Sequence, residues 1–128
     1  MPDMTIAIRS LERAVTTLPQ TGNWQSLVAN RVQCLREAYL QEVECGPASA
    51  EFALEATPWI YGRLQLLRRD QTRIVDELEA LARMCMEAID VEALRAQVQL
   101  ALQRITRLRQ RENDLIYESV DLDLGGEQ

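Results

Sequence analysis

Histidine and lysine are both absent from this chain of 128 residues. Without an imidazole, the chain cannot form a Ser–His or Cys–His catalytic pair, and it lacks the ligand that most helical metal sites need. All 14 basic residues are therefore arginines, set against 20 acidic residues for a net charge of −6. The plainest interpretation is a set of surface ion pairs, each contributing about 0–1 kcal/mol. The acidic balance argues against non-specific nucleic-acid binding, which needs a positive surface.

Long hydrophobic runs and recognisable cysteine motifs are also missing. No stretch of 18 apolar residues occurs, so we expect no membrane-spanning helix. The first ten residues do not resemble a signal peptide, which favours a cytoplasmic protein. The three cysteines are odd in number and form no CxxC pair. We expect Cys34 and Cys85 to be buried packing residues and Cys45 to lie exposed in a loop.

Hydrophobic spacing predicts an all-α protein. Apolar residues recur at steps of four and three over about residues 4–18, 23–44, 58–88 and 91–119, which is typical of amphipathic helices. Asp3, Asn23 and Asp90 are suitable N-caps, and a short extra helix is expected over about 48–56. The fold class is therefore an antiparallel up-down four-helix bundle with a short helix between the second and third long helices. Residues 1–119 form the domain, and 120–128 form a C-terminal tail.

Three of the apolar stripes are interrupted by a polar residue at a similar level: Glu42, Gln71 and Glu112. In one interpretation Glu42 and Glu112 reach solvent while Gln71 hydrogen-bonds across the bundle. In a second, the three join a structural network with Tyr39, Asp70 or an inward arginine. In a third, Glu42 and Glu112 hold a weakly bound hard cation such as Mg²⁺ or Ca²⁺.

The segments that carry these interruptions resemble the helices of bacterial hemerythrin-like domains. The run LLRRDQTRIVDELE (66–79) is similar to a family helix in which Gln71 takes the place of a histidine. In RLRQRENDLIY (107–117), Leu108 stands at a histidine position and Glu112 at an acidic one; in YLQEVE (39–44), Glu42 stands at a histidine position. The family's first-helix histidine has no counterpart in residues 6–11. The resemblance implies the bundle fold, with Gln71 and Glu112 as remnants of a lost non-haem di-iron site.

Two surface features are candidates for contacts with partners. Trp59 and Tyr61 flank the inward Ile60, so they either pack under the short helix near Phe52 or form an exposed patch. In the tail, Leu122 and Leu124 alternate with acidic residues. They either fold back on the bundle or serve as a docking peptide for a partner.

The function that these observations favour is a non-catalytic, metal-free interaction or regulatory module without a cofactor. Its partner would be another protein or a second copy in a homodimer, with no role for nucleic acid or membrane. One alternative is a carboxylate-based, di-iron-type metal protein with an oxygen-related or sensing role. Glu42 and Glu112 would bind its metal, and the only enzymatic activity it would have is that of a metal-dependent oxidase. Another is a small-molecule-binding bundle with a cavity near Gln71.

Overall fold

The computed structural model describes residues 3–16, 23–46, 58–87 and 90–126, with side chains up to residue 118. Within these ranges the chain forms four helices and no strands: α1 (Met4–Thr16), α2 (Trp24–Cys45), α4 (Pro58–Glu87) and α5 (Val91–Gly126). The prediction of an all-α protein with four long helices is confirmed. None of the described helices combines the length and hydrophobicity that a bilayer crossing requires. The short helix expected over 48–56 lies outside the described residues.

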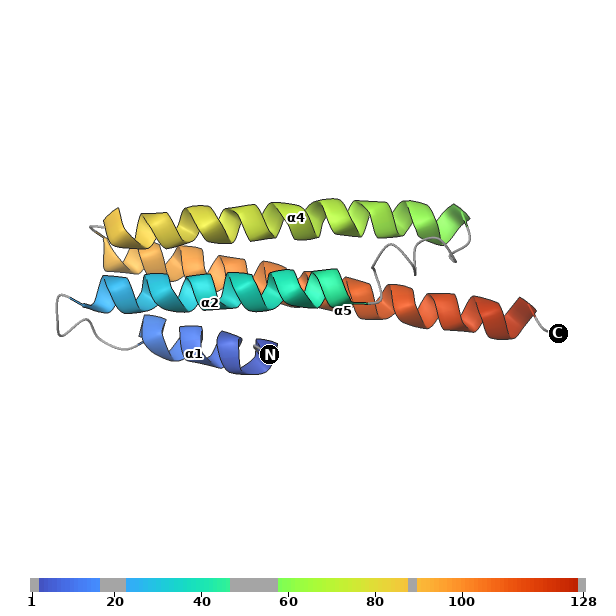
Figure 1. Cartoon of the computed structure of the whole chain (residues 1–128), viewed down its shortest axis with the longest axis horizontal. Helices are drawn as coiled ribbons and strands as arrows, with labels where there is room; N and C mark the ends of the chain where they lie inside the picture. The colour runs from blue at the N-terminus through green and yellow to red at the C-terminus, as the bar shows by residue number, and fades with distance from the viewer. Residues whose placement is uncertain (1–2, 17–22, 47–57, 88–89, 127–128) are drawn as a thin grey trace.

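The helices lie lengthwise beside one another, as Figure 1 shows. α2 packs between α1 and α4, α5 packs along α4, and α1 and α5 meet over a smaller area. α1 has 13 residues against 30 in α4 and 36 in α5. It therefore runs beside only part of the longer helices.

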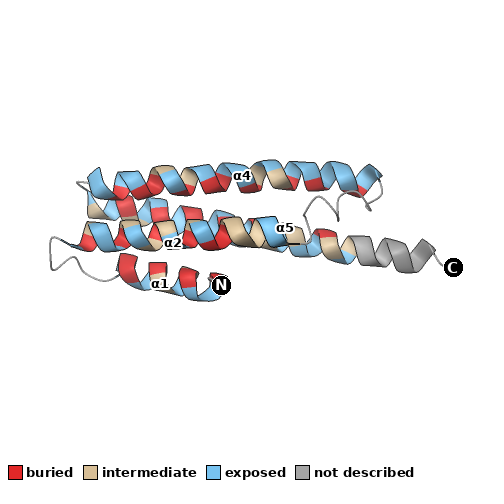
Figure 2. Ribbon diagram, viewed as in Figure 1, coloured by how far each residue is buried: buried red, intermediate tan, exposed pale blue. Residues whose placement is uncertain are grey.

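One apolar stripe of each helix faces its neighbours, and these stripes form the core (Figure 2). In α4 the four-three spacing predicted from sequence is borne out at every position. The buried members of that stripe are Ile60, Leu64, Leu67, Gln71, Ile74, Leu78, Leu81 and Cys85. Burying each large apolar side chain contributes about 1.5–3 kcal/mol before the loss of chain entropy.

The predicted N-caps differ in what their side chains do. Asp3 Oδ1 accepts a hydrogen bond from the backbone N–H of Thr5 at 2.8 Å. Asp90 Oδ1 accepts from the backbone N–H of Glu92 at 3.0 Å. Asn23 precedes α2 but makes no side-chain cap bond, so that part of the prediction was wrong.

The end of α5 also differs from the sequence prediction. We expected the helix to end near Ser119, but it continues to Gly126. Extending a helix that is already formed costs far less than nucleating one, so the weak helix propensity of the tail residues does not stop it.

Candidate functional site

The three predicted polar interruptions come together at one place in the bundle. With two further residues they form what we call the polar cluster: Tyr39 and Glu42 of α2, Gln71 of α4, and Arg109 and Glu112 of α5. Gln71 is only 1% exposed, and its Nε2 donates a hydrogen bond to Glu112 Oε2 at 3.0 Å. Arg109 donates from Nε and Nη2 to the two carboxylate oxygens of Glu42, each at 3.1 Å. The cluster therefore links three helices by side-chain hydrogen bonds.

The Arg109–Glu42 pair joins α2 and α5, whose backbones do not come into close contact within the described residues. α2 makes its backbone-level contacts with α1 and α4, and α5 makes its contacts with α4 and α1. A long side chain is therefore needed to join α2 to α5, and the arginine fork matches both carboxylate oxygens at once. The two side chains are 39% and 30% exposed, so the pair is only partly withdrawn from water.

The electrostatics of the cluster follow from burial and from two nearby acidic groups. Burial raises the pKa of Glu112, and the neighbouring Glu42 adds to this effect. The hydrogen bond from Gln71 and the charge of Arg109 lower the same pKa. Burial also raises the pKa of the Tyr39 phenol well above its ordinary value, with Glu112 and Glu42 acting in the same direction.

Two buried polar atoms of the cluster remain unpaired. The Tyr39 hydroxyl and Gln71 Oε1 have no hydrogen-bond partner among the described residues. The Gln71 amide is near enough to lower the pKa of Tyr39, yet geometrically the two groups do not form a hydrogen bond. An unsatisfied buried polar atom costs about 1–3 kcal/mol. Leaving these two atoms unpaired therefore lowers the free energy of unfolding.

Gly46, directly after α2, lets the chain pass close to the cluster. A Cβ atom added at this position would stand 2.7 Å from the backbone oxygen of Glu42 and 3.7 Å from Glu112 Oε1. The first distance is too short for a real Cβ contact. The absence of a side chain at residue 46 thus allows the chain to pass close to the Glu42 carbonyl, while the distance to Glu112 Oε1 is an ordinary contact.

Asp70 lies outside the polar cluster, although one interpretation of the sequence included it in a structural network with Glu42, Gln71 and Glu112. It accepts a hydrogen bond from Arg111 Nη1 at 2.7 Å on the surface, and that bond lowers the pKa of the Asp70 carboxyl. The arginine that joins the network is Arg109, which the sequence prediction did not identify. Its spacing of three residues before Glu112 places both on one face of α5, which is the signal that could have identified it.

The side chains of the polar cluster do not fit the di-iron centre that the hemerythrin-like resemblance implies. Gln71 is a neutral amide, and both oxygens of Glu42 are engaged by a guanidinium. No group of three or more His, Cys, Asp or Glu side chains within the described ranges could hold a metal ion. What the arrangement offers chemically is a hydrogen-bonded connection between helices.

The cysteines are free thiols with different surroundings. Cys85 is buried, as predicted, and burial raises the pKa of its thiol to about 11. Cys45 is exposed, as predicted, but it is the last residue of α2 and does not lie in a loop. Cys34 is exposed, so the prediction that it is buried was wrong. It follows Gln33 and precedes the buried Leu35, and one residue turns a helix by about 100°, which carries the thiol off the apolar stripe.

The aromatic candidates lie on the surface of α4. Trp59 is 58% exposed and Tyr61 is 44% exposed. The Arg63 guanidinium lies 5.1 Å from the centre of the Trp59 ring. Two residues of helix correspond to a rotation of about 200°, so Trp59 and Tyr61 occupy opposite flanks and do not make one patch. Their expected packing near Phe52 lies outside the described residues.

The tail candidates, Leu122 and Leu124, belong to the helical backbone of α5, and their side chains lie outside the described residues. No protein-family model, curated protein or solved structure gives a significant match to the chain. The hemerythrin-like resemblance stays a prediction.

Proposed function

We propose that the chain is a metal-free, non-catalytic helical bundle of hemerythrin-like descent that acts as an interaction or regulatory module. The observation that carries this proposal is the double hydrogen bond from Arg109 to Glu42. A guanidinium keeps its positive charge at any ordinary pH and satisfies both carboxylate oxygens, so the chain itself supplies the counter-charge that a metal ion would bring.

The antiparallel up-down order of the helices belongs to the same proposal. It is supported by three ion pairs between α4 and α5, in which each step of seven residues forward on α4 matches seven residues back on α5. These pairs are Arg63–Glu118, Asp70–Arg111 and Glu77–Arg104. A seven-residue repeat keeps the same faces in contact along the two helices.

An interaction role is further supported by the large apolar side chains on the outside of the bundle. Contiguous exposed apolar surface is a mark of contact with another protein or a second copy, whereas singly scattered apolar side chains are ordinary. Of the exposed set, Ile6 and Leu27 lie together in the lining of one groove. The exposed members are Ile6, Leu27, Trp59, Tyr61, Leu66, Met84, Met86, Leu100 and Tyr117.

A second candidate function is favoured by the unpaired atoms in the polar cluster. The Tyr39 hydroxyl can donate a hydrogen bond and Gln71 Oε1 can accept one, and both are buried without partners among the described residues. A small polar molecule with one acceptor and one donor would satisfy both. This candidate requires ligand binding that is lost when Tyr39 is replaced by phenylalanine.

Metal-linked stability tests the leading proposal. We would measure thermal unfolding under anaerobic conditions with and without Fe²⁺ or Mn²⁺. A metal present at 1,000 times its dissociation constant stabilises the folded state by about 4 kcal/mol. The proposal predicts no change in midpoint for the natural sequence. A rise that disappears in both Glu42→Gln and Glu112→Gln would overturn it and restore the metal-protein alternative.

A further inference from the structure

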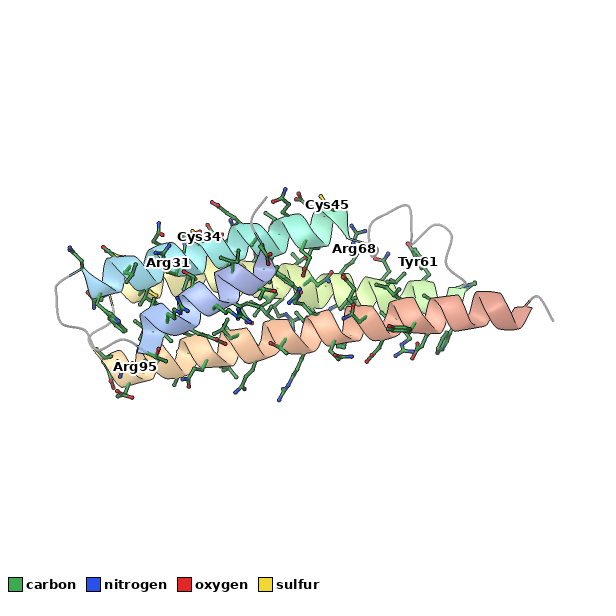
Figure 3. The ribbon with its side chains drawn as sticks, turned by 90° about the horizontal axis from the view of Figure 1, so that it is seen from below. Arg31, Cys34, Cys45, Tyr61, Arg68 and Arg95 are labelled. Atoms are coloured by element: carbon green, nitrogen blue, oxygen red, sulfur yellow. The ribbon has the colours of Figure 1, made fainter. Side chains whose placement is uncertain are left out.

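A groove between α1 and α2 combines exposed apolar surface with positive charge from arginine side chains. It has a volume of about 530 Å³, and its lining includes Ile6, Arg9, Arg13, Leu27 and Arg31. Figure 3 shows Arg31 on α2, beside α1. We call this the α1/α2 groove.

The apolar part of the groove comes from both helices. Ile6 of α1 is 67% exposed and Leu27 of α2 is 40% exposed. Both helices pack on the core through other, buried side chains, so these two residues are not needed for that packing. Leu27 and Arg31 are four residues apart on α2, and Ile6 and Arg13 are seven apart on α1. Each pair therefore lies along one face of its helix, so each helix contributes both an apolar and a basic side chain to the groove.

The charge of the groove is of one sign. Three arginines contribute to its lining and no acidic side chain does. Arg9 and Arg31 have no ion pair or hydrogen-bonded acceptor within the described part of the chain. The positive charge of the groove is opposite in sign to the net charge of the whole chain, which is −6. Since salt screens charges over about 8 Å at physiological ionic strength, the local arginines decide what binds here.

A second groove, between α4 and α5, provides a contrast. It is also rich in arginine, but Asp70 and Glu77 lie in its wall and pair with Arg111 and Arg104. The charges of that groove are therefore partly neutralised by its own acidic residues. The two grooves make a matched pair, because Arg73 and Arg107 of the α4/α5 groove lack ion-pair partners among the described residues, as Arg9 and Arg31 do.

We propose that the α1/α2 groove docks an acidic amphipathic helix of a partner protein. Apolar side chains of the partner, spaced three or four residues apart, would cover Ile6 and Leu27, while its carboxylates pair with Arg9 and Arg31. The inference rests on the proposed interaction role and specifies its partner. Charge complementarity selects the occupant: a basic helix is repelled, and a nucleic-acid backbone leaves the apolar side chains uncovered.

The test uses a fluorescein-labelled synthetic peptide of 18 residues, with leucine on one helical face and glutamate on its flanks. Binding to the full chain is followed by fluorescence anisotropy and by shifts of backbone amide NMR signals. A peptide with lysine in place of each glutamate serves as the ligand control. We expect the acidic peptide to bind and the basic one not to bind, with shifts confined to α1 and α2.

Matched variants separate the groove from general electrostatics. The double variant Arg9→Gln/Arg31→Gln removes two charges from the α1/α2 groove, and Arg73→Gln/Arg107→Gln removes two from the α4/α5 groove. The first should weaken binding by about tenfold or more, and the second by less than about twofold. Unfolding curves of both variants confirm that each remains folded.

Several results would overturn the inference. Equal weakening in both variants would show that binding follows net charge and not the groove. No binding up to about 1 mM peptide would exclude an acidic partner helix at this surface. Release of a dimer by the peptide would show that a second copy of the chain, and not a separate partner, normally occupies it. Shifts on α4 and α5 would reject the groove but leave the interaction role standing. Uptake of metal would reject the metal-free part of the proposed function, whatever the peptide does.

Discussion

Replacing Arg109 by methionine should destabilise the protein more than replacing Glu42 by glutamine. Loss of the guanidinium leaves the Glu42 carboxylate partly buried beside Glu112, with no counter-charge for either acid. Loss of the carboxylate leaves Arg109 with only a neutral amide oxygen to donate to, but the guanidinium is 39% exposed and can turn toward water. The two single variants therefore differ in stability because only Arg109→Met leaves two neighbouring acids without a positive charge beside them.

The expected magnitudes follow from the partial burial of the pair. Fully exposed ion pairs contribute about 0.2–1 kcal/mol, and breaking a fully buried pair costs about 3–5 kcal/mol. With exposures of 39% and 30%, we expect a cost of about 2–3 kcal/mol for Arg109→Met and about 1–2 kcal/mol for Glu42→Gln. In a double-mutant cycle the pair should show a coupling energy of about 1–2 kcal/mol.

Urea unfolding at neutral pH, monitored by circular dichroism, provides the assay. With a denaturant slope of about 1–3 kcal/mol per M, each kcal/mol of destabilisation lowers the midpoint by about 0.3–1 M urea. The coupling should fall as salt is added, because the pair is partly exposed. Additive effects of the two substitutions, with coupling below about 0.3 kcal/mol, would refute the argument that this pair holds α2 and α5 together.

Three further predictions concern pH, a hydroxyl group and two glycines. Because the folded-state pKa of Glu112 is raised, its ionisation costs stability as pH rises above the ordinary carboxyl range; the stability of Glu112→Gln relative to the natural protein should therefore increase between about pH 4 and pH 7. Asp70 has a lowered pKa, so its stabilising contribution is present above the ordinary carboxyl range and is lost as pH falls below it; Asp70→Asn should therefore fall behind the natural protein as pH rises from about 2 to about 5. Parallel urea titrations check both variants, and pH dependences of the same sign would contradict the assignment. Tyr39→Phe should leave stability unchanged or raise it by about 1 kcal/mol, since the hydroxyl has no partner among the described residues; a loss above 1 kcal/mol in thermal unfolding would reveal a hydrogen bond. Gly46→Ala should cost about 1–3 kcal/mol because its Cβ would meet a backbone oxygen at 2.7 Å, whereas Gly62→Ala, with open space around it in the second turn of α4, should stabilise by about 0.5–1 kcal/mol; equal unfolding midpoints would argue against this difference.

The positions of the core residues could be predicted because they depend on a local rule. In α4 the four-three spacing from Ile60 to Cys85 names residues that turn toward the neighbouring helices, whatever those neighbours are. The exposure of Cys34 shows the limit of this rule, since one residue of offset decides between core and surface. The continuation of α5 to Gly126 shows another, because helix propensity is weak evidence beside an existing helix.

The polar cluster could be predicted only in part. Glu42, Gln71 and Glu112 stand out because each breaks an apolar stripe. The partners could not be chosen, because pairing depends on the register between helices that are far apart in sequence. Arg109 does not break a stripe: it lies beside the buried Leu108 and reaches Glu42 only through its long side chain. The surface ion pair of Asp70 likewise depends on the register of α5 against α4.

We propose that Arg109 and Gln71, and not a metal ion, satisfy the acidic groups of the polar cluster. Metal analysis of protein isolated from its native host, by inductively coupled plasma mass spectrometry on freshly purified material, is the decisive experiment. We expect far less than one equivalent of any transition metal per chain. Two tightly held iron atoms per chain would contradict it.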